Sequence, residues 1–142
     1  MKDIFPVDAV VKDTGSLKGR GVFATKAFIA GELVETCPVI VLYQPFELLA
    51  PKIQKVVYNW GSLAKTGQCT ALVLGYGSLY NHNNPANMRY EADVENETLN
   101  YFAVSDIAAG EELTVNYNNT NGQPESDSDV WFDSRGVALI VD

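Results

Sequence analysis

The sequence has little of what most metal sites, disulfide scaffolds and membrane segments require. Its 142 residues include two cysteines and one histidine, too few for a disulfide framework, a four-cysteine zinc site or a multi-histidine site. No apolar run approaches the roughly 18 residues that a membrane helix needs, and the first residues lack the long apolar stretch of a signal peptide. We therefore expect a cytoplasmic protein with no metal ion and no membrane partner.

Positive charge is also scarce. Ten Lys and Arg residues stand against 18 Asp and Glu, a formal net charge of −8, which argues against nucleic acid as a partner. The excess of acidic over basic residues lies in the second half of the chain. Residues 1–70 carry eight basic and six acidic side chains, whereas residues 71–142 carry two and twelve. One explanation of the acidic half is that it attracts basic partners such as a Lys/Arg-rich peptide. The other is that the excess of acidic residues serves only solubility.

Helical periodicity is limited to one short segment, Phe46 to Ala50, which Pro51 is expected to end or kink. Short apolar stretches bounded by turn residues recur instead, a pattern typical of all-β or mainly β proteins. The predicted strands cover residues 9–11, 21–25, 33–36, 38–43, 56–60, 70–74, 97–104 and 113–117. With no internal repeat and no linker, the chain is predicted to form one domain over residues 1–142, with a core at about 9–117.

The C-terminal part divides into two stretches. Residues 118–129 are polar and acidic, which predicts a loop or a mobile lid. Residues 130–142 become apolar again at Trp131 and Phe132, so the chain is expected to return there to the body of the protein. These two aromatics either anchor the tail in the core or cover a site.

Three further segments carry residues suited to chemistry. The first, Lys18–Phe23, has two glycines that let the backbone approach a ligand, although taken alone a hairpin turn explains them better. The second, Tyr80–Asn87, holds four asparagines and the single histidine, His82, which most often has a structural role. The third, Gly110–Tyr117, ends in a tyrosine that either packs as an amphipathic ring or aims its hydroxyl at a reacting centre.

In this order and at these spacings, the segments resemble the SET-domain protein lysine methyltransferases. Lys18–Phe23 looks like that family's first cofactor motif, Asn81-His82 like its Asn-His signature, and Gly110–Tyr117 like its closing motif. Each motif is weak alone, but the ordered set spans about residues 9–132. The resemblance implies a mainly β, SET-domain fold of several small sheets, with a C-terminal pseudoknot around the Asn-His segment. The small single-domain bacterial and viral members are the most similar.

The resemblance also implies a site. The cofactor would be S-adenosyl-L-methionine and the catalytic residue Tyr117. The lysine channel would include Tyr90 and Phe132. The residues implied to contact the cofactor are Lys18, Gly19, Arg20, Gly21, Asn81, His82, Tyr117 and Trp131.

The sequence departs from the family pattern at several positions. Asn83 and Asn84 replace the serine and the cysteine or aromatic residue that usually follow the Asn-His pair. Ser78 replaces a frequent arginine, Pro85 comes one place early before Ala86-Asn87, and no cysteine-rich tail follows Tyr117. These departures weaken any inference about a histone substrate and affect the cofactor site and Tyr117 less.

The leading hypothesis is an enzyme that methylates a lysine of a protein or peptide, acting as a monomer or homodimer. A methyl group on a sulfonium needs only an aligned neutral amine, and an apolar channel lined by tyrosines favours that form of lysine. Two alternatives stay open: a catalytically silent SET-like module that binds a basic peptide, and an enzyme that methylates a small-molecule amine. The target lysine and the number of methyl groups added lie beyond the sequence.

Overall fold

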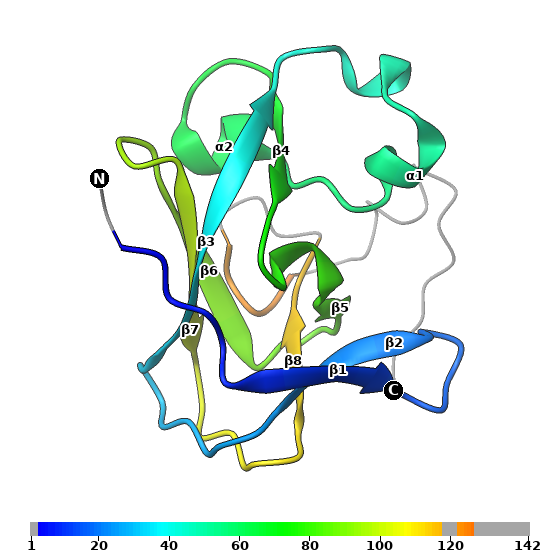
Figure 1. The fold of residues 1–142 in the computed structure, drawn as a ribbon. Helices are drawn as coiled ribbons and strands as arrows, with labels where there is room; N and C mark the ends of the chain where they lie inside the picture. Colours follow the sequence, from blue (N-terminus) through cyan, green and yellow to red (C-terminus); the bar gives the residue numbers. More distant parts are fainter. Residues whose placement is uncertain (1–2, 118–121, 127–142) are drawn as a thin grey trace.

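The computed structural model describes residues 3–117 and 122–126, and it confirms a mainly β fold (Figure 1). One four-stranded sheet has the order β1 (Ala9–Asp13), β2 (Arg20–Ala24), β8 (Glu112–Val115), β5 (Asn81–His82). The other has the order β4 (Thr70–Val73), β3 (Leu33–Leu42), β7 (Thr98–Ala103), β6 (Met88–Asp93). All neighbouring strands are antiparallel except β5 and β8.

The second sheet supplies much of the core. In β7 five of the six side chains are buried, as expected of a central strand flanked by β3 and β6. β3 combines two predicted strands, because Pro38 continues the ladder with Thr98 instead of interrupting it. The most buried large side chains come from both sheets and from the connections: Tyr80, Tyr101, Met88, Leu99, Ile107 and Leu113.

Helical structure is short. The turn predicted at 46–50 forms and ends before Pro51, but three further helical segments of the described residues are not predicted by the sequence. The helices are the 3-10 turns η1 (Phe46–Leu48) and η2 (Gly77–Leu79) and the α-helices α1 (Pro51–Gln54) and α2 (Trp60–Ala64). Pro51 opens α1, because the first helical turn needs no backbone N–H from proline. The strand predicted over 56–60 does not form. Asn59 caps α2 by accepting the N–H of Ser62 at 3.2 Å, and Tyr58 keeps only an isolated bridge to Ala71. Within the described ranges, no helix has the length and apolar character to cross a membrane.

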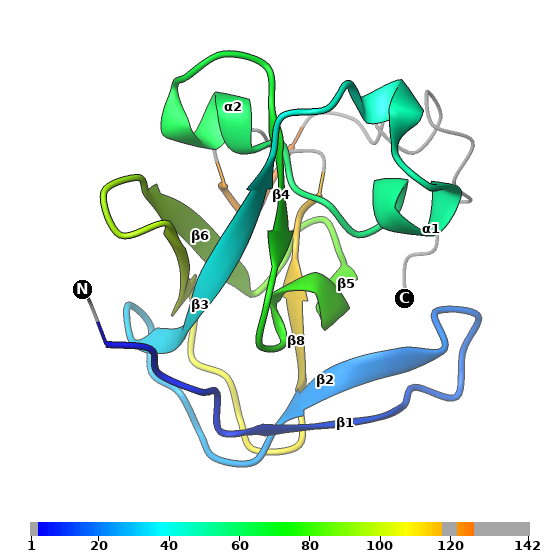
Figure 2. The ribbon, with the colours of Figure 1, turned by 45° about the horizontal axis from the view of Figure 1, so that its top comes forward.

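The parallel pair β5–β8 determines where the site lies. It aligns Asn81 with Thr114 and His82 with Val115, so two of the three motifs lie side by side near the centre of Figure 2. The chain after β8 then returns to the same region, where the O atoms of Gly122 and Pro124 accept the N–H groups of Tyr90 and Ala86, both at 2.9 Å. These are contacts that a pseudoknot around the Asn-His segment requires.

Most of the C-terminal part lies outside the described residues. This applies to the predicted loop at 118–129, apart from residues 122–126, and to the segment 130–142 with Trp131 and Phe132. The roles implied for these two aromatics therefore stay predictions.

Candidate functional site

The glycine segment forms the tight turn between β1 and β2, as the hairpin interpretation predicts. Gly19 has φ +74, a conformation that favours glycine, and no atom lies within 4 Å of the place where its Cβ would stand. Gly21 is different. A Cβ there would lie 2.4 Å from Oε2 of Glu112 and 3.0 Å from Nδ2 of Asn81. No side chain blocks the approach to Gly19, although its N–H donates to the O atom of Ser16 at 3.1 Å and its O atom accepts the N–H of Thr14 at 2.8 Å, whereas Gly21 is required by close packing.

Asn81 joins the glycine segment to the closing motif. Its Nδ2 donates to the main-chain O of Arg20 at 2.9 Å and to Oε2 of Glu112 at 2.7 Å. The three segments that the sequence analysis singled out therefore meet at one side chain.

A hollow of about 320 Å³ adjoins this junction, and it is lined by Lys18, Asn83 and Glu112 among others. Its volume lies at the small end of ligand pockets. A lysine, a carboxylate and an amide are the groups that bind an amino acid's carboxylate and ammonium, and the space beside Gly19, which has no side chain, leaves room for close approach. The residues present therefore fit a cofactor with an amino-acid portion.

His82 and the segment before it hold Tyr117 at two points. His82 is 5% exposed, and its Nδ1 accepts the main-chain N–H of Tyr117 at 3.1 Å, with ring centroids 5.8 Å apart. The Tyr117 hydroxyl donates to the main-chain O of Tyr80. The histidine thus has the structural role usual for a buried imidazole, and the tyrosine that it positions is the predicted catalytic residue.

Tyr117 belongs to a group of five tyrosines, called the tyrosine cluster: Tyr58, Tyr80, Tyr90, Tyr101 and Tyr117. Tyr58 lies at its centre, edge-to-face with Tyr90 (5.2 Å between centroids) and with Tyr117 (6.2 Å). Its hydroxyl donates to the O atom of Gly77 at 2.9 Å and accepts from Tyr101 at 2.9 Å. Tyr90, implied as a channel residue, is 3% exposed and donates to the O atom of Asn116 at 3.0 Å.

Burial controls the protonation of this cluster. Desolvation raises the pKa of Tyr117, with the carboxylate of Glu112 adding to the effect, and it raises the pKa of Tyr90, with Tyr117 adding to it. The pKa of Tyr58 is also well above its usual value because of burial and the neighbouring phenols. These phenols are therefore neutral at physiological pH, where they act as hydrogen-bonding groups and apolar walls instead of bases.

Sequence reasoning missed Tyr58, Tyr80 and Tyr101 as members of this cluster. The sequence places Tyr58 and Tyr101 in predicted strands and Tyr80 at the start of the asparagine-rich segment, and it indicates no role for any of the three. No local signal marks them, because Tyr58 precedes α2, Tyr80 follows η2 and Tyr101 lies in β7, and they meet only in the folded protein. Tyr58 shares a segment with Trp60, and two aromatics before a glycine were the one available hint.

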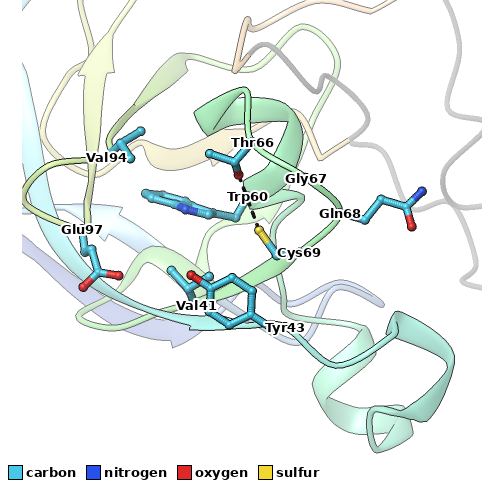
Figure 3. A pocket seen from close by; sticks show the side chains of 9 residues that line it. All are labelled: Val41, Tyr43, Trp60, Thr66, Gly67, Gln68, Cys69, Val94 and Glu97. Carbon is cyan, nitrogen blue, oxygen red and sulfur yellow. Dashed lines mark hydrogen bonds between the residues drawn. The ribbon is translucent and has the colours of Figure 1, made fainter.

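Two further hollows lie around Tyr43, Gln68 and Cys69, and the larger one reaches Tyr58. One, of about 410 Å³, is lined by residues 43–47, 57–59 and 68–70, including Tyr58 itself. The other, of about 180 Å³, shares Tyr43, Gln68 and Cys69 with it and has Trp60 and Glu97 in its wall (Figure 3). The larger hollow therefore connects an exposed rim at Tyr43, 78% exposed, with the tyrosine cluster.

The departures from the family pattern have structural roles. Ser78 accepts the N–H of Val73 and donates to the O atom of Val56, both at 3.2 Å, which ties η2 to its surroundings. Asn84 exchanges two hydrogen bonds with Ser126: its Nδ2 donates to the O atom of Ser126 at 2.9 Å, and its Oδ1 accepts the N–H at 3.2 Å. Asn84 therefore fastens the returning chain to the turn after His82.

Comparison with known proteins decides the family. The SET domain family model matches residues 19–118. The chain is a SET-domain protein lysine methyltransferase. A histone-lysine N-methyltransferase of Schizosaccharomyces pombe, described as specific for lysine 37 of histone H3, is 31% identical over 107 residues, which are 75% of this chain and 71% of the relative.

Solved structures show the same fold. A Plasmodium falciparum protein described as a histone methyltransferase has a TM-score of 0.63 at 23% identity, over 81% of this SET domain and 96% of that chain. The polycomb repressive complex 2 of Chaetomium thermophilum has a TM-score of 0.60 at 19% identity, over 81% of this chain but only 16% of that chain.

Proposed function

We propose that this SET domain transfers a methyl group from S-adenosyl-L-methionine to a lysine side chain of a Lys/Arg-rich protein. The observation that carries the proposal is the position of Tyr117. Its main chain is held by His82, its hydroxyl is held by Tyr80, and its ring packs on Tyr58. The description of the fission-yeast relative as a histone-lysine methyltransferase supports a basic protein as the substrate.

The cofactor would lie between the glycine turn and the asparagine-rich segment. Lys18 and Glu112 offer charges of both signs to its amino-acid portion. Contacts with Gly19, Arg20, Asn81 and His82 are those that the family resemblance implies. When bound, the cofactor supplies a methyl group already activated by a positively charged sulfur. Trp131, implied by the family resemblance to complete this side, lies outside the described residues.

The protein's own part in the reaction is to align the lysine nitrogen with the methyl group and to remove water from around that nitrogen. The lysine nitrogen must be neutral to attack the methyl carbon, and its reference pKa is about 10.4. An apolar channel beside Tyr58, Tyr90 and Tyr117 lowers that pKa, because burial disfavours the ammonium. The residues of this channel would hold the neutral nitrogen in line with the methyl group that the bound cofactor would supply. Since the phenols are neutral, the proton that the lysine loses beforehand goes to water.

The substrate would approach through the hollow that reaches Tyr58. A lysine entering there would pass the exposed Tyr43 before it meets the tyrosine cluster. The acidic second half of the chain gives a negative field that attracts basic peptides. Raising the salt concentration should therefore raise KM for a basic peptide more than it lowers kcat.

Two glycines of the same turn give a matched test of cofactor binding. Gly15 and Gly19 have φ +76 and +74, and each has open space where a Cβ would stand. Alanine at either position therefore costs a similar strain of about 1 kcal/mol. We expect S-adenosylmethionine to raise the melting temperature of the parent and of Gly15→Ala, and to raise that of Gly19→Ala much less. An equal shift in both variants would contradict the cofactor position.

The transfer itself is tested with radiolabelled S-adenosylmethionine and three acceptors: core histones, a histone H3 amino-terminal peptide, and free lysine. Label on protein lysine is the expected result. Label on free lysine alone would support the small-molecule alternative. Cofactor binding without label on any acceptor would support the silent, peptide-binding module.

A further inference from the structure

Glu35 is a buried carboxylate on β3 with no part in the chemistry described above. It is 3% exposed, and both of its oxygens accept hydrogen bonds: Oε1 from the Tyr80 hydroxyl at 2.7 Å, and Oε2 from the main-chain N–H of Tyr76 at 3.0 Å. A buried carboxylate is costly unless such bonds compensate for lost hydration. Its two partners lie on either side of η2, so one side chain holds both ends of residues 76–80.

The same five residues hold the hydroxyls of the tyrosine cluster. The O atom of Gly77 accepts from Tyr58 at 2.9 Å and from Tyr101 at 3.4 Å. The O atom of Tyr80 accepts from Tyr117. The directions of three phenol groups thus depend on where two carbonyl groups of this loop lie.

The loop packs too closely to shift by much. A Cβ on Gly75 would lie 2.6 Å from Oε2 of Glu35, and a Cβ on Gly77 would lie 2.8 Å from the Tyr101 hydroxyl. Only glycine fits at these contacts. The position of the loop is therefore set by Glu35 on one side and by the cluster on the other.

We propose that Glu35 is a positioning residue for methyl transfer, which acts by fixing residues 76–80 so that their carbonyls direct the hydroxyls of Tyr58 and Tyr117. The proposal rests on the proposed function, because its effect on rate needs the transfer reaction. A carboxylate accepts at both oxygens, so the Tyr80 hydroxyl and the Tyr76 N–H both donate to Glu35. With glutamine, the amide oxygen would still accept the Tyr76 N–H, but the NH2 group would donate to the Tyr80 hydroxyl, which reverses that hydrogen bond and turns the hydroxyl hydrogen away from residue 35.

The experiment compares Glu35→Gln, Tyr80→Phe and their double variant with Val34→Ala as the control. Val34 precedes Glu35 on the same strand, is 4% exposed, and its truncation destabilises the fold without removing a hydrogen bond to the loop. For Glu35→Gln we expect kcat to fall about 10-fold, because a small displacement of an aligning group is costly. KM for S-adenosylmethionine should stay within about twofold. Tyr80→Phe should lower kcat in the same direction, and the double variant should fall by less than the product of the two single effects.

Equal kcat in Glu35→Gln and the parent, with only a lowered melting temperature as in Val34→Ala, would overturn the proposal. A double variant whose loss of kcat equals the product of the two single losses would also overturn the proposal.

A readout without turnover separates this proposal from the proposed function. In protein labelled with carbon-13 at the tyrosine Cζ, Glu35→Gln should shift the signals of Tyr58 and Tyr117 and leave that of the exposed Tyr43 in place. If the parent protein transfers no methyl group, the proposed function fails while this measurement still tests the loop. Unchanged Tyr58 and Tyr117 signals would contradict the role of Glu35.

Discussion

Tyr117 contributes a single hydroxyl oxygen to the proposed chemistry, so Tyr117→Phe should separate catalysis from folding. The ring would still pack on Tyr58 and His82, and its main-chain N–H would still reach Nδ1 of His82. We expect kcat to fall about 100-fold, as for removal of one aligned polar group from a desolvated site, with cofactor affinity nearly unchanged. Initial rates and titration calorimetry measure the two quantities. Parent-like activity of Tyr117→Phe would make Tyr117 a packing residue only.

Tyr90→Phe should affect the product more than the rate. The Tyr90 hydroxyl donates to the O atom of Asn116, one residue before Tyr117, and its ring packs edge-to-face on Tyr58. Removing it leaves a buried carbonyl without this donor, a cost of about 1 kcal/mol, and enlarges the space beside the amine. We expect a smaller loss of kcat than for Tyr117→Phe and more methyl groups per lysine. Mass spectrometry of the peptide product measures this, and an unchanged product distribution would argue against a channel role.

The sequence predicts site residues only where they belong to motifs that follow one another along the chain in the family's order. Asn81, His82 and Tyr117 were predicted from the ordered motifs, and the structure brings them together. Tyr58 and Glu35 could not be found this way. Their importance lies in contacts with Tyr117 and Tyr80, and residues 35 and 80 are separated by 45 positions.

At the scale of elements, Asn84 connects the Asn-His segment to residues 122–126 through hydrogen bonds with Ser126. Asn84→Ala removes the two reciprocal bonds with Ser126, whereas Asn116 still bonds the Oγ atom of Ser126 at 3.0 Å and the O atom of Pro124 at 3.3 Å. We expect a loss of about 1–2 kcal/mol in unfolding free energy, with faster hydrogen exchange confined to residues 122–126. Asn96→Ala, in the distant turn between β6 and β7, is the control. Exchange that rises equally in both variants would contradict the local role of Asn84.

Strands were easier to predict than helices in this chain. Most apolar runs bounded by turn residues became strands, with ends displaced by one or two residues, as at β4 and β7. α2 was missed because Tyr58 and Trp60 favour strands by propensity, while the cap at Asn59 decides the outcome. β6 was missed because Arg89 and Glu91 interrupt its apolar pattern on the outer face of the sheet.

The whole molecule should be sensitive to alkali, because five of its seven tyrosines share one buried cluster. The pKa of each cluster tyrosine is raised in the folded state, chiefly by desolvation. In the unfolded chain these phenols ionise near pH 10. Stability from this source is therefore fully present below about pH 10. It falls as the pH rises towards the folded-state pKa values, because the unfolded chain then releases protons that the folded chain keeps.

Urea unfolding between pH 8 and 11 tests this. Each cluster tyrosine contributes a slope of up to about 1.4 kcal/mol per pH unit above pH 10. We expect a flat unfolding free energy up to about pH 9.5, a steep fall above it, and a shallower fall in Tyr90→Phe. A parent curve that stays flat to pH 11 would contradict the burial of the cluster.

The pairing of β5 with β8 also sets an order of events during synthesis. A ribosome adds residues from the N-terminus at about 5–20 per second, so the glycine turn and Asn81-His82 are made before the strand that joins them. The backbone N–H that His82 accepts belongs to Tyr117, which is added 35 residues later. A nascent chain stalled, or a polypeptide cleaved, before residue 112 therefore carries part of the cofactor site but neither β8 nor Tyr117. Under the proposed function, such an incomplete chain lacks the catalytic tyrosine and would transfer no methyl group.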